Sequence, residues 1–267
     1  MMRFLFLVLF LGLGAWAIDP NVAIFSQKME LPKGNTKTET AMIVAKSFLE
    51  RPYTPHTLEQ TPEKLVCNLK EFDCFTFVES VLALTASKHG RKVYSEYVNN
   101  LQQMRYRKGE INDYGSRLHY FLEWKLQNET RGLFSDVTAQ LGGEKTQPTI
   151  NFMTTHRNAY AGLQEEAAFE QVVKVETTLS QTSWHKIPKE KVAAVEAQLK
   201  EGDIIGITSN IAGLDFNHEG FVVKKDNRVH LLHASSDAKK VVISADPLTT
   251  YLQKIKKHDG IVVLRLK

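Results

Sequence analysis

The sequence predicts an α+β fold in which helices come first and an antiparallel sheet follows. Two observations lead to this prediction. A helix with an apolar stripe begins near Asp73, and several short β-branched runs separated by turn residues come after Lys200. Segregation of helices and strands along the chain is typical of α+β proteins. Because no linker is visible, we expect one domain over residues 18–267, with a mainly helical elaboration at about 91–200.

The composition indicates a globular protein with a substantial core. Of the 267 residues, 43% are hydrophobic and 24% are charged, as is usual for a folded domain. The net charge of +4 comes from 34 basic and 30 acidic residues, which are scattered along the chain. This excess is too small to indicate a nucleic-acid partner.

The first seventeen residues, "MMRFLFLVLFLGLGAWA", have the three parts of a secretory signal peptide. These parts are a basic residue (Arg3), an apolar run from Phe4 to Leu13, and small residues at Ala15 and Ala17. The apolar run is too short to span a bilayer comfortably, although an uncleaved anchor is the alternative. We therefore expect an exported protein, periplasmic or extracellular, with no stable membrane anchor once the peptide is removed near Ile18.

The helical part of the chain is read from its periodicity and its turn residues. A helix is expected over residues 41–50, and a proline-punctuated loop follows at 51–64. The helix that begins near Asp73 comes next. Residues 91–126 are mainly helical in pattern, 141–149 form a glycine- and proline-containing connection, and 151–170 are mixed and helical.

The part after Lys200 is expected to form strands. Residues 202–209 read as a strand, and 218–225 and 228–236 read as a hairpin whose turn is Asp226-Asn227. Two further strands are expected at 239–245 and 260–266, with a short helix at 247–255 between them.

Cys74 is expected at the start of the helix that Asp73 caps. Unsatisfied N–H groups and the helix dipole favour a thiolate there, so such a cysteine can have a pKa of about 3.5–7.5. The alternative is a disulfide with Cys67, seven residues earlier, since exported proteins tend to pair their cysteines.

The predicted hairpin brings two histidines together. If Lys225 lies opposite Arg228, then Gly220 lies opposite His233. His218 and His233 then project from the same face as diagonal neighbours, within reach of each other's imidazole. A nucleophile, a base and a group that orients the base are what an activated thiol needs. The alternative is that these histidines are structural.

Other catalytic signatures are missing from the sequence. It contains no HExxH, CxxC, GxSxG, phosphate-binding loop or dinucleotide fingerprint, so we expect no metal and no cofactor.

The chain resembles papain-like cysteine peptidases of the NlpC type, and more specifically the bacterial N-acetylmuramoyl-L-alanine amidase-like family of exported cell-wall hydrolases. The resemblance implies a papain-like core in which an N-terminal helix carries the nucleophile and packs on a C-terminal antiparallel sheet. It also implies that Cys74 is the nucleophile, His218 the general base and His233 the group that orients His218. The matching segments span residues 51–236: "RPYTPHTLE", "LVCNLKEFDCFTFVE", "RYRKGEINDYGSRLHYFLEW", "INFMTTHRNAY", "GDIIGITSNIAGLDFNHEGF" and "LLHASS".

Two residues depart from the family pattern. Phe75 follows the nucleophile where a small polar residue is usual, which could alter the pocket for the acyl group. Cys67 stands where an aliphatic residue is expected, and we interpret it as a buried thiol rather than a second nucleophile.

Five residues are candidates for substrate binding. The resemblance places Tyr53 near the nucleophile. Arg105 and Arg117 could pair with carboxylates of a peptide stem or a lactyl group. Tyr120 and Trp124, four apart on a helix, could form a platform for a sugar ring, unless they belong to the core.

The function implied is cysteine-dependent hydrolysis of peptidoglycan, at the amide between N-acetylmuramic acid and L-alanine. The alternatives are an endopeptidase that cuts the stem peptide between D-glutamate and diaminopimelate, a wall-binding module without catalysis, and a zinc amidase. The expected partners are peptidoglycan or muropeptide fragments, and we expect a monomer.

Overall fold

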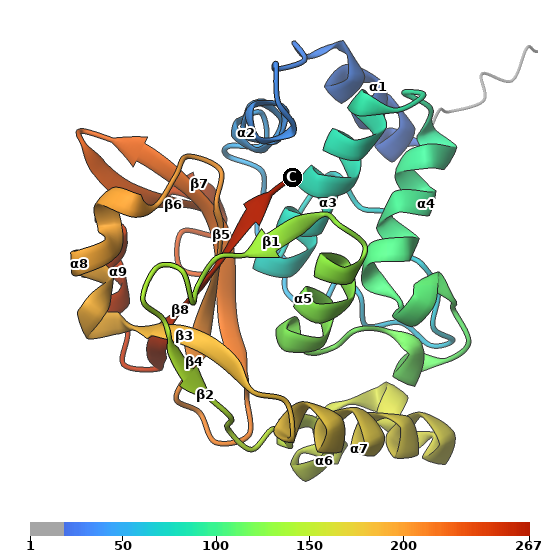
Figure 1. The fold of residues 1–267 in the computed structure, drawn as a ribbon. Helices are drawn as coiled ribbons and strands as arrows, with labels where there is room; N and C mark the ends of the chain where they lie inside the picture. The colour runs from blue at the N-terminus through green and yellow to red at the C-terminus, as the bar shows by residue number, and fades with distance from the viewer. Residues whose placement is uncertain (1–18) are drawn as a thin grey trace, which may run out of the picture.

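The computed structural model describes residues 19–267, which form one antiparallel sheet with helices on both of its sides (Figure 1). The predicted signal peptide lies outside the described residues. Within the described part, no helix is long and apolar enough to cross a membrane. The predicted α+β class is therefore confirmed.

The helices cluster mainly on one side of the sheet, as Figure 1 shows for α1 to α5. Two of them, α8 and α9, lie on the other side. The helix bounds are α1 Pro20–Glu30, α2 Lys37–Lys46, α3 Cys74–His89, α4 Tyr94–Arg105, α5 Phe121–Thr130, α6 Phe152–Thr155, α7 Glu166–Ser180, α8 Val192–Val195 and α9 Leu248–Lys254.

The strands of the described residues form one sheet in the order β2-β3-β8-β4-β5-β6-β7, with β1 paired to β8. All of its ladders are antiparallel. The strand bounds are β1 Phe134–Asp136, β2 Glu144–Thr146, β3 Trp184–Pro188, β4 Ile204–Ser209, β5 Phe216–Lys225, β6 Arg228–Ser235, β7 Lys240–Ile243 and β8 His258–Leu266.

The predicted elaboration at about 91–200 is not only helical. It also supplies β1, β2 and β3, of which β1 and β3 pair directly with β8. These strands have only three to five residues. Runs this short are below the length at which apolar and polar alternation can be recognised.

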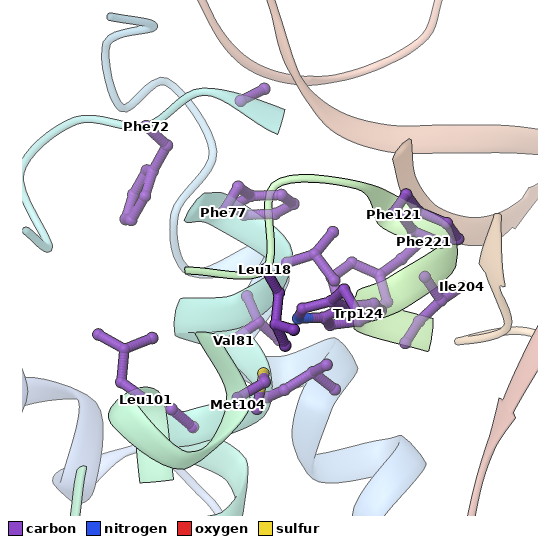
Figure 2. Close-up of a cluster of buried hydrophobic side chains, with 14 of the residues drawn as sticks. Phe72, Phe77, Val81, Leu101, Met104, Leu118, Phe121, Trp124, Ile204 and Phe221 are labelled. Carbon is purple, nitrogen blue, oxygen red and sulfur yellow. The ribbon is translucent and has the colours of Figure 1, made fainter. Parts of the chain in front are cut away.

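The main core lies between α3 and the sheet. Figure 2 shows Phe77 of α3 beside Phe221 of β5, with Trp124 and Phe121 of α5 closing the cluster. The rings of Phe77 and Phe221 meet edge to face with centroids 5.9 Å apart, a favourable aromatic geometry. A second apolar cluster covers the opposite face of the sheet, where α9 contributes Leu248 and Leu252. The sheet is thus buried on both faces.

The predicted hairpin is confirmed. Asp226 and Asn227 have φ of 51° and 60°, as a two-residue type I′ turn requires, and Lys225 lies opposite Arg228. The pairing of β5 with β6 stops at Phe221 and Leu232, although both strands continue beyond it. Residues 216–220 of β5 therefore have no ladder partner on β6, and their backbone groups on that side are available to the start of α3.

The buried Lys88 ties the end of α3 to α1. Its side chain is 1% exposed, and its ammonium donates to the carbonyls of Lys28, Met29 and Leu31 at 3.1, 2.9 and 2.7 Å. These carbonyls are at the C-terminus of α1, where helical carbonyls lack intrahelical partners and favour a cation. Lys88 therefore fixes α1 on the helix that starts at Cys74.

We expect Lys88→Met to lower the free energy of unfolding by about 2–4 kcal/mol, because it removes charged hydrogen bonds and leaves buried carbonyls unpaired. Urea unfolding followed by circular dichroism measures the change. Lys70→Met, at an exposed position, is the control and should change stability by less than about 0.5 kcal/mol. Equal stability of the two variants would contradict the role of Lys88.

Candidate active site

Cys74 is the first residue of α3, and its position is fixed by a capping box. The Asp73 side chain accepts from the backbone N–H of Thr76 at 2.8 Å, and the Thr76 hydroxyl accepts from the N–H of Asp73 at 3.0 Å. This reciprocal pair defines where the helix begins. The predicted placement of Cys74 at a helix start is confirmed.

His218 of β5 and His233 of β6 form a direct pair. Nε2 of His218 lies 2.5 Å from Nδ1 of His233, and the rings are perpendicular with centroids 4.7 Å apart. The two imidazoles therefore meet on one side of the sheet, as the hairpin register predicts. Gly220 lets the strands come this close, because a Cβ there would lie 2.9 Å from Cβ of His233.

One cavity of about 450 Å³ joins the cysteine to the first histidine of the pair. Cys74 and His218 both line it. No hydrogen bond joins them among the described residues, and such bonds are often long before substrate binds. The other lining residues are Phe75, His119, Phe121, Phe152, Tyr160, Ile211, Leu214, Asp215, Phe216, Asn217, Glu219 and Lys257.

The pKa of the Cys74 thiol is raised, which corrects the expectation of a lowered one. Burial is the largest cause, followed by the negative charges of Asp73 and Glu219. Hydrogen bonds from the backbone N–H groups of Glu219 and Phe75 act in the opposite direction but do not outweigh these effects. The helix start thus holds a neutral thiol in the absence of substrate.

Burial also keeps both imidazoles neutral. It lowers the pKa of His218 well below 6.5, with His233 as the next cause. It lowers the pKa of His233 to about 4, although the negative charge of Asp237 acts to raise that pKa. The resting site therefore contains a thiol and two uncharged rings.

Both cysteines are free, so the alternative of a Cys67–Cys74 disulfide is excluded. Cys67 is partly buried and packs against the main core. Burial raises the pKa of its thiol. These properties agree with the interpretation of Cys67 as a packing thiol.

Among the residues predicted to bind substrate, Tyr53 pairs through its backbone with Phe72, two residues before Cys74. Burial, and then the charges of Cys74 and Asp73, raise the pKa of its phenol to about 12, so the hydroxyl keeps its proton. Arg117 and Tyr120 line a second pocket of about 200 Å³ that shares Phe75 and His119 with the first. Both side chains already have hydrogen-bond partners within the protein. Arg117 donates to Glu59 at 2.9 Å, and the Tyr120 hydroxyl donates to Glu176 at 2.6 Å.

The structure corrects the prediction for Arg105 and Trp124. Arg105 is 1% exposed and donates from Nε to Glu79 at 2.7 Å. Trp124 is fully buried and donates from Nε1 to the same carboxylate at 3.2 Å. Because the buried Glu79 requires a counterion and a donor, both residues belong to the interior and do not reach a ligand.

Two residues near the site were not predicted. Tyr251 of α9 packs against His233 and His258, with ring centroids 5.4 and 5.5 Å away. Its helix could be read from the sequence, but the sequence does not show where that helix packs. Glu219 lines the same cavity as Cys74. Its position directly after His218 in the sequence is the only local signal that points to it.

Within residues 19–267, no group of three or more His, Cys, Asp or Glu side chains is arranged to hold a metal ion.

Comparison with known proteins identifies the family. Residues 43–261 match the family described as AmiA-like, N-acetylmuramoyl-L-alanine amidase-like. The chain belongs to this family. A comparison with curated proteins gave no match.

Solved structures of related proteins share the fold. An N-acetylmuramoyl-L-alanine amidase from Bacteroides uniformis ATCC 8492 is 39% identical, with a TM-score of 0.82 over 86% of this chain and 99% of that one. A Bacteroides fragilis protein named as a candidate xylanase is 37% identical, with a TM-score of 0.78 over 83% and 99%. A Legionella pneumophila protein, 19% identical with a TM-score of 0.70 over 92% and 93%, shares the fold alone.

We expect Gly220→Ala to lower the free energy of unfolding by about 1–3 kcal/mol, because the new methyl would lie 2.7 Å from the Leu232 carbonyl oxygen and force β5 and β6 apart. Thermal unfolding measures the loss, and the change in His218 and His233 imidazole NMR signals reports their separation. Gly142→Ala, where the surroundings are open, should leave these signals unchanged. Unchanged signals in the Gly220 variant would contradict the close approach.

Proposed function

We propose that this protein is a cysteine-dependent peptidoglycan hydrolase that cleaves the amide between N-acetylmuramic acid and L-alanine. Membership of the amidase-like family supports the substrate class. The observation that carries the mechanism is the single cavity lined by Cys74 and His218, with His233 bonded to His218. On this proposal the helix and sheet form a papain-like core of the NlpC type.

The first step is attack of sulfur on the carbonyl carbon of the lactyl group. Since the thiol is neutral at rest, His218 takes its proton as the new C–S bond forms. The imidazolium so produced donates from Nε2 to Nδ1 of His233, which stays an acceptor because its pKa is about 4. His233 thus orients the base and stabilises its charge.

Two donors are placed to stabilise the oxyanion of the tetrahedral intermediate. One is the backbone N–H of Cys74, which is unpaired at the first position of α3. The other is the hydroxyl of Tyr53, which keeps its proton beside the sulfur.

Breakdown of the intermediate releases the amine. His218 returns its proton to the nitrogen of L-alanine, the C–N bond breaks, and a thioester remains on Cys74. Water, deprotonated by His218, then attacks the thioester. The products are the muramic acid carboxylate, the stem peptide and the free thiol.

We also propose that the enzyme acts outside the cytoplasm. The N-terminal sequence and the wall-directed family together support an exported, periplasmic or extracellular enzyme. It would act as a monomer on peptidoglycan or muropeptide fragments, without a metal or cofactor.

We expect Cys74→Ala and His218→Ala each to reduce kcat/KM at least about 1000-fold, because each removes a group that forms or breaks a bond. Mass spectrometry of a muropeptide digest measures both the rate and the bond cut. Cys67→Ser is the matched control and should keep activity within about threefold. Full activity of Cys74→Ala would disprove the mechanism.

The same digest separates the alternatives. Release of the intact stem peptide supports the amidase, whereas release of L-Ala-D-Glu supports the endopeptidase. Absence of any product from the wild type, with muropeptide still bound, supports a binding module.

The acid limb of the kcat/KM profile is expected below pH 6.5. His218 must be neutral to accept the thiol proton, and its lowered pKa keeps it neutral at pH values where an ordinary histidine is charged. Activity should therefore be retained at pH 6 and lost only at lower pH. A limb at or above pH 6.5 would show that the pKa of His218 is not lowered in the folded site.

A further inference from the structure

Glu219 is a buried carboxyl group without a partner, next to the proposed nucleophile. Its side chain is 2% exposed, and neither carboxyl oxygen has a hydrogen-bond partner among the described residues. Unpaired buried polar groups are costly and uncommon, so this one requires an explanation. The mechanism above does not use this carboxyl group.

The surroundings of this carboxyl are acidic and aromatic. The acidic groups that act on it are Glu79 of α3 and Asp73, the residue that caps this helix, and Cys74 follows Asp73. The other titratable residues that line the same cavity are His119, Asp215, His218 and Lys257. On β4 the residue opposite is Gly206, which offers no side chain, and from α5 the ring of Phe121 lines the same cavity.

The cation that pairs with the neighbouring Glu79 is already engaged. Arg105 donates from Nε to Glu79 at 2.7 Å and from Nη1 to the carbonyl of Val66 at 2.7 Å. Among the described residues, no cation pairs with either carboxyl oxygen of Glu219. Burial, with Glu79 and Asp73 as further causes, raises its pKa well above 4.5.

We propose that Glu219 is a positioning residue that acts on Cys74 through its charge: the protonated carboxyl permits thiolate formation, and loss of its proton inhibits catalysis at alkaline pH. The proposal rests on the proposed function for its effect on catalysis. Glu219 would act through electrostatics rather than by contact with the substrate, because both of its carboxyl oxygens are buried.

The physical reason is the proximity of two developing anions. Cys74 and Glu219 line the same cavity, and the charge of Glu219 is one of the causes that raise the pKa of the Cys74 thiol. An anion at Glu219 would oppose both the thiolate and the oxyanion in a site from which water is largely excluded, where charges interact strongly. A protonated carboxyl carries no such penalty.

The first test measures the reactivity of Cys74 itself, so that it does not depend on the substrate. Wild-type protein and Glu219→Gln are alkylated with iodoacetamide from pH 6 to 10, and mass spectrometry follows the Cys74 peptide separately from the Cys67 peptide. We expect similar rates at pH 6 and at least a tenfold faster reaction of the variant at pH 9.5. A constant ratio at every pH would overturn the proposal, whether or not the protein proves to be an amidase.

The second test measures kcat/KM for a purified muropeptide over the same pH range. The alkaline limb of the wild type should move up by at least one pH unit in Glu219→Gln, with activity at pH 6 kept within threefold. Glu201→Gln, at a surface ion pair with Lys46, is the control and should keep the wild-type profile. An identical alkaline limb in wild type and Glu219→Gln would overturn the proposal.

A third measurement checks that the carboxyl is neutral in the fold. Since the folded pKa lies above the unfolded value of about 4.5, wild-type stability falls as the pH rises from that value through the folded pKa. The gain in Tm of Glu219→Gln over wild type should therefore be larger at pH 8 than at pH 5. Glu219→Leu also removes the ionisable group and should show the same trend, and equal gains at both pH values would overturn the proposal.

Discussion

The position of the α3 N-terminus against the hairpin is the constraint on which the rest of the site depends. The capping box of Asp73 and Thr76 fixes the residue at which the helix begins, and the contact of Phe77 with Phe221 fixes the helix on β5. The β5–β6 ladder ends at Phe221 and Leu232, and beyond this end His218 and Glu219 of β5 line the same cavity as Cys74. A shift of one residue in either contact would move the thiol away from the strand that carries His218.

The interior beneath the site explains why several polar side chains have structural rather than substrate-binding roles. Glu79 is completely buried on α3 and is held by Arg105 and by the indole of Trp124. Removing one partner of a buried ion pair costs more than the pair contributes, because it leaves an uncompensated charge. The arginine and the tryptophan are therefore tied to the helix that carries the nucleophile.

The sequence predicted those parts of the molecule that local patterns determine. The two-residue turn at Asp226-Asn227 sets the hairpin register, and the register brings His218 and His233 together. The roles of Arg105 and Trp124 were not predictable, because their burial depends on Glu79, which is 26 and 45 positions away in the chain. The short strands β1 to β3 were missed because their strand character comes from pairing with distant segments, as in β1 with β8.

The raised pKa of Cys74 shows how tertiary burial can outweigh a local rule. The sequence places this cysteine where a helix dipole favours a thiolate, but the folded site surrounds it with apolar and acidic groups. Burial shifts the thiol and the imidazole toward their neutral forms. In the proposed mechanism, the proton is therefore transferred only when the carbonyl arrives. Oxidation of cysteine follows thiolate character and exposure. In the oxidising compartment proposed here, a nucleophile that remains a partly buried, neutral thiol until substrate binds is protected from the oxidation to which an exposed thiolate is prone.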